Sequence, residues 1–152
     1  MSKVDLVDAE DCCAPQNQLD MAQAGEQATS SRDLKIRILV AEDNDVNRRV
    51  IAGMLADGDY DVHFVFDGVQ AVSAYRDLRP DIVLMDLAMP NMNGLDATTE
   101  IRKLESGSKP TKVIGLTAYA TAEDRQVCLD SGMDEFLPKP VNYENLMALL
   151  RV

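Results

Sequence analysis

The sequence predicts an α/β protein built on a parallel sheet, and three observations support this prediction. From residue 35 onward, short apolar runs typical of strands alternate five times with segments of helical periodicity. Three of these runs are continuously apolar, as strands buried on both faces are. Turn residues such as Gly58, Asp67-Gly68, Pro80 and Gly132 separate successive elements. The alternation implies right-handed crossover connections, with helices covering both faces of the sheet.

Each predicted strand is followed by a predicted helix. The strands are expected over Ile36–Ala41, Asp61–Phe66, Asp81–Met85, Lys112–Thr117 and Glu135–Leu137. The helices are expected at about Val46–Ala56, Val69–Leu78, Gly94–Leu104, Ala122–Ser131 and Tyr143–Leu150. The first, third and fourth strands are the continuous apolar runs, so we expect them at the centre of the sheet. The second strand alternates only weakly between apolar and polar residues, which suits an edge position.

Composition limits both the number of domains and the function classes. A chain of 152 residues, 46% of them hydrophobic, has room for one domain with a proper core. We expect residues 1–34, which are polar and show little periodicity, to be a disordered or weakly helical leader, and residues 35–152 to be the folded domain. No membrane-length apolar run and no secretory signal pattern is present, which favours a cytoplasmic protein without membrane insertion. A net charge of −11 without clustered Lys and Arg argues against nucleic-acid binding.

Cysteine and histidine offer no metal or catalytic site. Cys12 and Cys13 lie in the leader, where a redox pair, an acylation site and ordinary thiols all remain open. Cys128 falls within a predicted helix and is expected to be a buried structural thiol. His63 is the sole histidine and lies in a predicted strand, so we expect it to be a residue of the pleated sheet without chemistry.

Chemically useful side chains follow four of the predicted apolar runs. Glu42 and Asp43 follow the first, Asp86 the third, Thr117 the fourth and Lys139 the fifth. Because a ligand crevice in a parallel α/β sheet lies outside the carboxyl ends of the strands, these side chains should converge there. Any one of the carboxylates alone would be interpreted as a solvated loop residue. Their joint placement predicts a functional pocket.

With Pro90 and Gly94 behind Asp86, and Pro140 behind Lys139, the chain resembles the receiver domain of two-component response regulators. The segments AEDNDVNRRV and LMDLAMPNMNG are especially similar to receivers of hybrid sensor histidine kinases. The resemblance spans residues 35–152. It implies a flavodoxin-like (βα)5 fold with strand order 2-1-3-4-5, which would bring Asp43 and Asp86 together at the switch point. It also implies a cis peptide bond before Pro140.

The resemblance further implies that Asp86 is the phosphoacceptor. It would take a phosphoryl group from the phosphohistidine of a histidine kinase or a histidine phosphotransfer protein, forming an acyl phosphate. Mg²⁺ is the implied cofactor, because it tolerates one or two carboxylates together with phosphoryl oxygens and waters. Asp43 and Asp86 would bind the ion directly, Glu42 would act through water, and the backbone carbonyl of Ala88 would complete the protein ligands.

Lys139, Thr117 and Phe136 have implied roles in charge compensation and switching. Lys139 would pair with Asp86 at rest and with a phosphoryl oxygen after transfer. Thr117 would donate its hydroxyl to the phosphoryl group and, with Phe136, would switch the surface formed by the fourth helix, fifth strand and fifth helix. A downstream protein target would read that surface. Ala88 and Tyr119 depart from the most familiar receiver pattern, which leaves the phosphoryl lifetime open.

Two other functions share part of this residue pattern. A phosphohydrolase of the haloacid dehalogenase type also uses a strand-end Asp with Mg²⁺, but it requires a second Asp where this chain has Ala88. A pseudo-receiver that only binds partners would lack Asp86, Lys139 or the acidic pair, and all are present. The sequence therefore predicts a phosphoacceptor signalling domain rather than an enzyme. Whether it stands alone or belongs to a larger sensor kinase remains open.

Overall fold

The computed structural model describes residues 35–105 and 110–151. The predictions made for the leader, including those for Cys12 and Cys13, lie outside the described residues.

Within the described residues, five strands alternate with five helices. In chain order they are β1 (Ile36–Ala41), α2 (Asp45–Leu55), β2 (Tyr60–Val65), α3 (Gly68–Leu78), β3 (Ile82–Asp86), α4 (Gly94–Leu104), β4 (Lys112–Thr117), α5 (Ala122–Asp130), β5 (Glu135–Pro138) and α6 (Tyr143–Leu150). The strands form one parallel sheet in the order β2-β1-β3-β4-β5. This confirms the predicted flavodoxin-like fold, with the three continuously apolar strands at the centre and the second strand at an edge.

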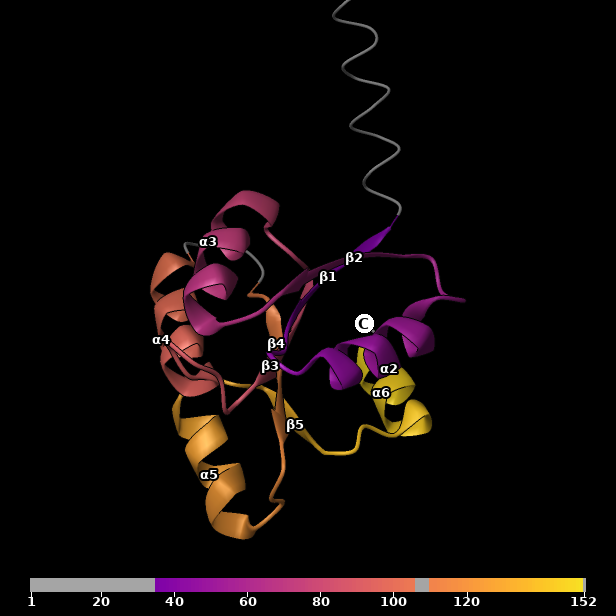
Figure 1. The fold of residues 1–152 in the computed structure, drawn as a ribbon. Helices are drawn as coiled ribbons and strands as arrows, with labels where there is room; N and C mark the ends of the chain where they lie inside the picture. The colour runs from indigo at the N-terminus through magenta and orange to yellow at the C-terminus, as the bar shows by residue number, and fades with distance from the viewer. Residues whose placement is uncertain (1–34, 106–109, 152) are drawn as a thin grey trace, which may run out of the picture. The chain divides into compact units, whose positions relative to one another are not determined.

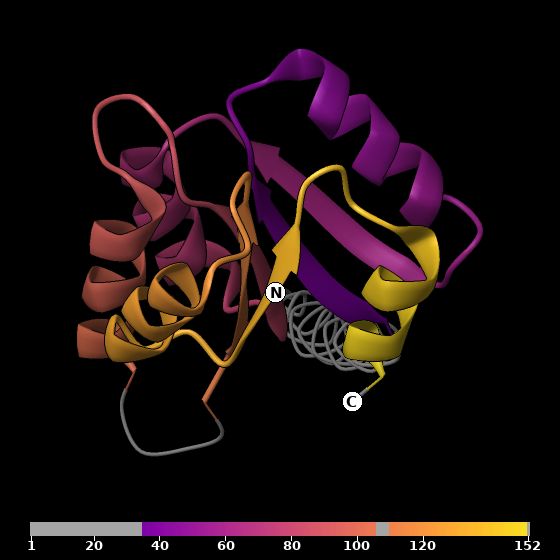
Figure 2. The same ribbon diagram turned by 90° about the horizontal axis from the view of Figure 1, so that it is seen from below.

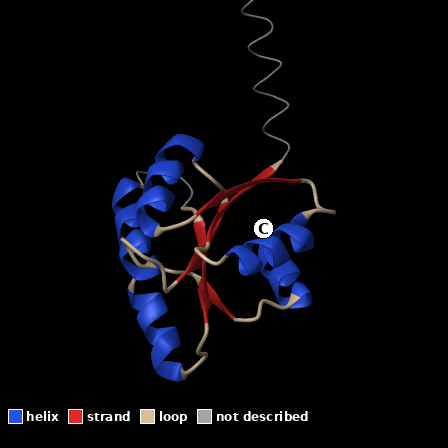
Figure 3. Ribbon diagram, viewed as in Figure 1, coloured by secondary structure: helices blue, strands red, loops and turns tan. Residues whose placement is uncertain are grey.

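Helices cover both faces of the sheet, as Figures 1 and 3 show. The helices α3, α4 and α5 lie on one side, and α2 and α6 lie on the other, an arrangement that the view in Figure 2 repeats from below. Successive side chains of a strand point to opposite faces, so the sheet has two cores. Leu39 of β1 packs with Ile101 and Cys128 in the first, while Val40 packs with Ile51 and Leu146 in the second. Cys128 is buried, as predicted.

The bounds of β2 and β3 differ from the prediction because hydrogen-bond register sets them. The β2 strand runs from Tyr60 to Val65, one residue earlier than expected at both ends, since Tyr60 pairs with Ile36 at the start of the ladder. Phe66 lies beyond the ladder and is half exposed. The β3 strand begins at Ile82 rather than Asp81 and includes Asp86, which pairs with Leu116 of β4. The backbone of Asp86 is therefore held by the sheet itself.

Helix starts are set by capping side chains that the prediction did not use. Asn44 accepts hydrogen bonds from the backbone N–H groups of Val46 and Asn47, so α2 begins at Asp45. Asp67 caps α3 in the same way, and that helix begins at Gly68. Other ends shift by one residue: α2 ends at Leu55, α5 at Asp130 and β5 at Pro138.

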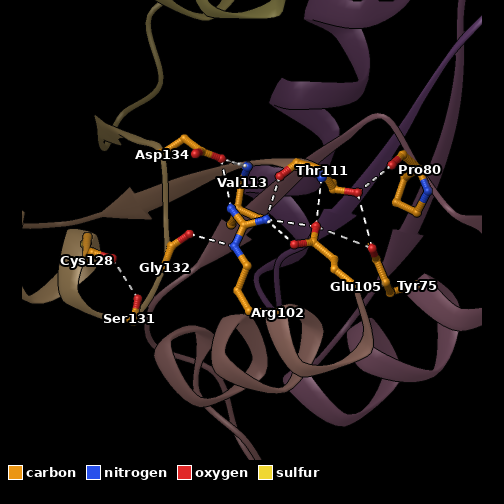
Figure 4. A network of polar contacts seen from close by, with 10 residues as sticks. All are labelled: Tyr75, Pro80, Arg102, Glu105, Thr111, Val113, Cys128, Ser131, Gly132 and Asp134. Atoms are coloured by element: carbon orange, nitrogen blue, oxygen red, sulfur yellow. Dashed lines mark hydrogen bonds and ion pairs between the residues drawn. The ribbon is translucent and has the colours of Figure 1, made fainter. Parts of the chain in front are cut away.

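A polar network centred on Arg102 fastens the end of the sheet opposite the carboxyl ends of the strands (Figure 4). The Arg102 guanidinium donates to the carbonyls of Gly132 and Thr111, at 2.8 Å each. It also donates to the carboxylates of Glu105 and Asp134, both at 2.9 Å. Because Arg102 lies on α4, the network joins that helix to β4 and to the loop between α5 and β5.

We expect Arg102→Met to lower the free energy of unfolding by about 2 to 4 kcal/mol, because two carbonyls would lose this donor and the two carboxylates would keep only their other donors, such as the N–H groups of Thr111 and Val113. Urea denaturation would measure the change. The matched control is Lys103→Met, since Lys103 is 65% exposed and contacts only Glu100 among the ion pairs described. That variant should differ from the native protein by no more than about 0.5 kcal/mol. Equal losses in the two variants would contradict a special role for Arg102.

Candidate functional site

The carboxyl ends of β1 and β3 bring three carboxylates together. Glu42 and Asp43 directly follow β1, and Asp86 is the last residue of β3, its neighbour in the sheet. One carboxylate oxygen from each lies within 4.8 Å of the others. Glu42 is fully buried and Asp86 is 2% exposed, whereas Asp43 is open to solvent. The chain leaves these strands toward helices on opposite faces of the sheet, which opens the crevice in which the carboxylates meet.

Lys139 places one ammonium between two of these carboxylates. Its Nζ lies 2.8 Å from Asp86 Oδ1 and 2.9 Å from Glu42 Oε2. The peptide bond that follows it, to Pro140, is cis, as the resemblance implies. Lys139 directly follows β5, an edge strand, so residues separated by about a hundred positions in the sequence meet at this point.

The two oxygens of the Glu42 carboxylate have different surroundings. Oε1 accepts a hydrogen bond from the backbone N–H of Asn44 at 3.1 Å. Oε2 is buried and accepts no hydrogen bond from the described residues, so its contact with Lys139 is an ion pair without hydrogen-bond geometry. This oxygen retains the capacity to accept a hydrogen bond, for example from water bound to a cation.

Burial and neighbouring charges shift the pKa values of Asp86, Glu42 and Lys139. Burial raises the pKa of Asp86 to about 6, helped by the adjacent Glu42 carboxylate and opposed by Lys139. Burial would also raise the pKa of Glu42, but Lys139 and the Asn44 backbone N–H outweigh it and hold that pKa below its ordinary value. Burial alone would lower the pKa of Lys139, yet its two carboxylate partners hold it above the ordinary value. The lysine is therefore charged at neutral pH.

The segment after Asp86 starts close to its carboxylate. The backbone N–H of Ala88 donates to Asp86 Oδ1 at 3.2 Å, and that of Leu87 donates to the Leu116 carbonyl at 3.1 Å. Helix α4 begins so close to this strand end that a Cβ atom on Gly94 would overlap the carbonyl oxygen of Asp86. Only glycine permits this approach. Ala88, the predicted carbonyl ligand, is thus held near the acidic cluster, the group formed by Glu42, Asp43 and Asp86.

Thr117 lies at the same end of the sheet but is turned toward its own loop. Its hydroxyl donates to the Tyr119 carbonyl at 2.6 Å and accepts from the Tyr119 backbone N–H at 3.1 Å. Among the described residues, the structure gives no contact between this hydroxyl and Asp86. The predicted convergence therefore holds for Lys139 and the carboxylates, while the Thr117 side chain is engaged elsewhere.

Phe136 lies outside the acidic cluster. It is half-buried on β5, and the Arg125 guanidinium of α5 lies 5.5 Å from its ring centroid. A shallow hollow beside it is lined by Leu137 and by Ala148 and Leu149 of α6. The aromatic ring thus belongs to a surface shared by α5, β5 and α6.

His63 lies on β2, where it contacts Asp61 at 3.2 Å.

The structure adds Arg48, which sequence reasoning missed. Its guanidinium donates to the Glu42 carbonyl at 2.8 Å and to Asp45 at 3.1 Å, and it stacks 4.4 Å from the centre of the Phe66 ring. Arg48 thereby fastens the segment that carries Glu42 and Asp43. Helical spacing could have suggested the contact with Asp45, but no local pattern indicates the other two.

The donor set suits a hard divalent cation. Mg²⁺ prefers oxygen ligands, keeps several waters and is bound by one or two carboxylates. The solvent-open Asp43 and the buried Asp86 offer such oxygens, and Glu42 Oε2 retains capacity to accept a hydrogen bond. The residues present therefore fit Mg²⁺.

Comparison with known proteins identifies the family. Residues 38–151 match the model of the response regulator receiver domain. The chain belongs to this family. The sensor histidine kinase RcsC of Salmonella typhi is 40% identical over 124 residues, which make up 82% of this chain and 13% of that kinase. Hybrid signal transduction histidine kinase B of Dictyostelium discoideum is 37% identical over 121 residues, 73% of this chain and 6% of that protein. The receiver thus spans a small part of the length of these relatives.

Solved receiver structures agree in fold. The receiver domain of a sensor histidine kinase from Pseudomonas aeruginosa PAO1, with a magnesium ion coordinated in its active site cleft, is 40% identical with a TM-score of 0.70. The match covers 77% of this chain and 95% of that one. A co-crystal structure from Saccharomyces cerevisiae, of the histidine phosphotransfer protein Ypd1 with the receiver domain of Ssk1, gives 26% identity and a TM-score of 0.72 over 76% and 86% of the two chains.

These matches confirm the predicted family and the predicted function class, a receiver domain of two-component and phosphorelay signalling. No helix in the described ranges is both long and apolar enough to cross a membrane.

Proposed function

We propose that this receiver accepts a phosphoryl group from a phosphohistidine onto Asp86, with Mg²⁺ bound by the acidic cluster. The observation that carries the proposal is the position of the Lys139 ammonium, 2.8 Å from a buried carboxylate that also lies beside two further acidic groups. Among residues 35–105 and 110–151, Asp86 alone combines a backbone held at the end of a strand, an ammonium partner and neighbouring carboxylates that could bind a metal ion.

The transfer forms one bond and breaks another. A carboxylate oxygen of Asp86 attacks phosphorus while the phosphorus–nitrogen bond to the donor imidazole breaks, and the imidazole keeps that electron pair and takes up a proton. The nucleophile must be ionised. With a pKa of about 6, Asp86 is largely ionised at neutral pH despite its burial.

Positive charge must offset the approach of two anions. Lys139 would shift from Asp86 to a phosphoryl oxygen, so that its charge stays compensated before and after transfer. Bound Mg²⁺ would supply further positive charge at the phosphoryl oxygens. Asp43 and Asp86 would hold the ion directly, Glu42 through water, and Ala88 through its backbone carbonyl.

Phosphorylation would be transmitted by Thr117. Its hydroxyl would leave the Tyr119 carbonyl, to which it now donates at 2.6 Å, and donate to the phosphoryl group. This exchange would release the loop that leads into α5. Phe136, which packs beside Arg125 of that helix, would repack, and the surface of α5, β5 and α6 would change.

The proposed partners follow from this chemistry and from the similar proteins. Two of those proteins are histidine kinases, a third is the receiver domain of one, and one similar structure contains a histidine phosphotransfer protein. A protein of one of these two classes would be the donor, and a downstream protein target would read the switched surface. We assign the domain to the cytoplasm, because the ATP that charges histidine kinases is found there. Its role is that of a signalling phosphoacceptor rather than an enzyme.

The proposal is tested by incubating the protein with acetyl phosphate and Mg²⁺ and measuring its intact mass. One hydroxylamine-labile phosphoryl group should appear, and it should be absent from Asp86→Asn. Asp130→Asn, which alters an exposed carboxylate at the end of α5, is the matched control and should be phosphorylated normally.

Three outcomes would contradict the proposal. Phosphorylation of Asp86→Asn would place the acceptor elsewhere. Sustained hydrolysis of p-nitrophenyl phosphate would favour a phosphohydrolase. A native protein that binds a histidine phosphotransfer protein, yet takes up no phosphoryl group with Mg²⁺ present, would favour a pseudo-receiver.

A further inference from the structure

The loop of residues 87–93, which follows Asp86, is anchored at both ends. At the sheet end, the Leu87 N–H donates to β4. At the far end, Asn91 Nδ2 donates to Asp67 Oδ2 at 2.7 Å, and the Gly68 N–H donates to the Met92 carbonyl at 3.0 Å. The second anchor joins this loop to the start of α3, an element outside the acidic cluster.

Asp67 uses both oxygens of a buried carboxylate in this anchor. It is 7% exposed, its Oδ1 accepts the Gln70 N–H at 2.8 Å as the cap of α3, and its Oδ2 accepts the Asn91 amide. The hydrogen bond from Gln70, followed by that from Asn91, lowers the pKa of Asp67. The carboxylate is therefore ionised at neutral pH, and a hydrogen bond to a charged acceptor is stronger than one between neutral groups.

The backbone at the second anchor restricts which residue types can occupy positions 68 and 91. Asn91 has φ 67°, in the left-handed region that Asn tolerates better than most residues. A Cβ atom on Gly68 would overlap the carbonyl oxygen of Met92, so the close approach of the two loops requires glycine.

We infer that the Asp67–Asn91 hydrogen bond positions the Ala88 carbonyl for the cation. Ala88 lies between the two anchors, one residue after Leu87 and three before Asn91. Without the Asp67–Asn91 hydrogen bond, the far end of this loop would keep only backbone hydrogen bonds, from Gly68 to Met92 and from Gly94 to Leu87. Ala88 would then belong to a less restricted segment, and ordering that segment on cation binding would cost conformational entropy. Asp67 and Asn91 are positioning residues, and this inference rests on the proposed function, because it takes the Ala88 carbonyl as a ligand.

Asp67→Asn separates this role from the capping of α3. Asn caps helices as well as Asp does, so Oδ1 can still accept the Gln70 N–H. The new Nδ2 would face the Asn91 amide, which would have to turn its Oδ1 inward to accept, so a neutral hydrogen bond would replace the stronger one to a carboxylate. Exchanging the two residues, as Asp67→Asn with Asn91→Asp, restores the hydrogen bond with donor and acceptor reversed. Asn91→Gly keeps the net charge and the left-handed backbone but removes the amide, so it controls for the charge lost in Asp67→Asn.

The experiment measures Mg²⁺ affinity from amide chemical shifts, hydrogen exchange of residues 87–93 without metal, and acetyl phosphate transfer over a range of Mg²⁺ concentrations. Asp67→Asn and Asn91→Gly should each raise the Mg²⁺ dissociation constant by about 5- to 10-fold, the equivalent of one hydrogen bond. Hydrogen exchange in the loop should accelerate, while the transfer rate at saturating Mg²⁺ stays within about twofold of the native rate. The exchanged pair should restore the native dissociation constant to within about twofold.

Unchanged affinity in both single variants would overturn the inference, even if loop exchange accelerates. An exchanged pair that melts like the native protein but binds Mg²⁺ as weakly as Asp67→Asn would also overturn it. Failure of the proposed function is distinguishable, because it would appear in the native protein as an absence of Mg²⁺-induced shifts around Asp86.

Discussion

Lys139→Met should lower the free energy of unfolding by about 3 to 5 kcal/mol at pH 8 without divalent cations, because removing one partner of a buried ion pair leaves the other charge uncompensated. The Lys139 ammonium contacts both Asp86 and Glu42, at 2.8 and 2.9 Å, and both carboxylates are buried. The variant would leave two buried negative charges without a cation. Urea denaturation would measure the loss, which should shrink as the pH falls and the carboxylates take up protons.

A second substitution tests the cause of this loss. Glu42→Gln combined with Lys139→Met removes one of the two unpaired charges and should recover part of the stability, whereas additive losses would contradict the coupling.

Phosphorylation offers an independent readout of the role of Lys139. Lys139→Met should slow acetyl phosphate transfer by about 10²- to 10³-fold at saturating Mg²⁺, the effect of removing one preorganised donor from developing charge. A rate within tenfold of the native rate would mean that Lys139 is only structural.

Asp86→Asn should have the opposite effect on stability. Burial raises the pKa of Asp86 from 3.8 to about 6 in the folded protein. The folded state therefore binds this proton more tightly than the unfolded state, and the resulting stabilisation is present below pH 3.8 and lost as the pH rises to about 6. The difference between the two pKa values corresponds to about 3 kcal/mol. Without metal at pH 8, Asp86→Asn should gain up to about 3 kcal/mol over the native protein.

The pH dependence and Mg²⁺ distinguish this cause from a general effect of the substitution. The stability difference between the two proteins should grow between pH 4 and pH 6 and then level off. Glu42 acts in the other direction, since its lowered pKa gives a stabilisation that is lost as the pH falls, so only the difference between variants isolates Asp86. Millimolar Mg²⁺ at pH 8 should raise the melting temperature of the native protein more than that of Asp86→Asn. Equal stability of the two metal-free proteins at pH 8 would refute the argument.

The sequence by itself determined the fold class, the family and the members of the acidic cluster. Continuously apolar runs marked the central strands, because only strands buried on both faces lack alternation. Residues at the ends of parallel strands meet at one edge of the sheet whatever the details of packing, so the proximity of Glu42, Asp43 and Asp86 could be predicted. Boundaries were less accurate. Whether Phe66 and Asp86 belong to their strands depends on hydrogen bonds with neighbouring strands, which local residue patterns do not encode.

Only the tertiary structure decided how these side chains pair. It showed that Lys139 contacts two carboxylates rather than one, that the Thr117 hydroxyl donates to Tyr119, and that Arg102 joins three segments. It also brought Asp67 to Asn91, which lies 24 residues away in the chain. Secondary structure follows from periodicity over a few neighbouring residues, and its signal is therefore present in the sequence. The partner of a polar side chain depends on how whole elements pack. A hydrogen bond requires two atoms to lie within about 3 Å of each other, and local sequence patterns do not position distant segments that accurately.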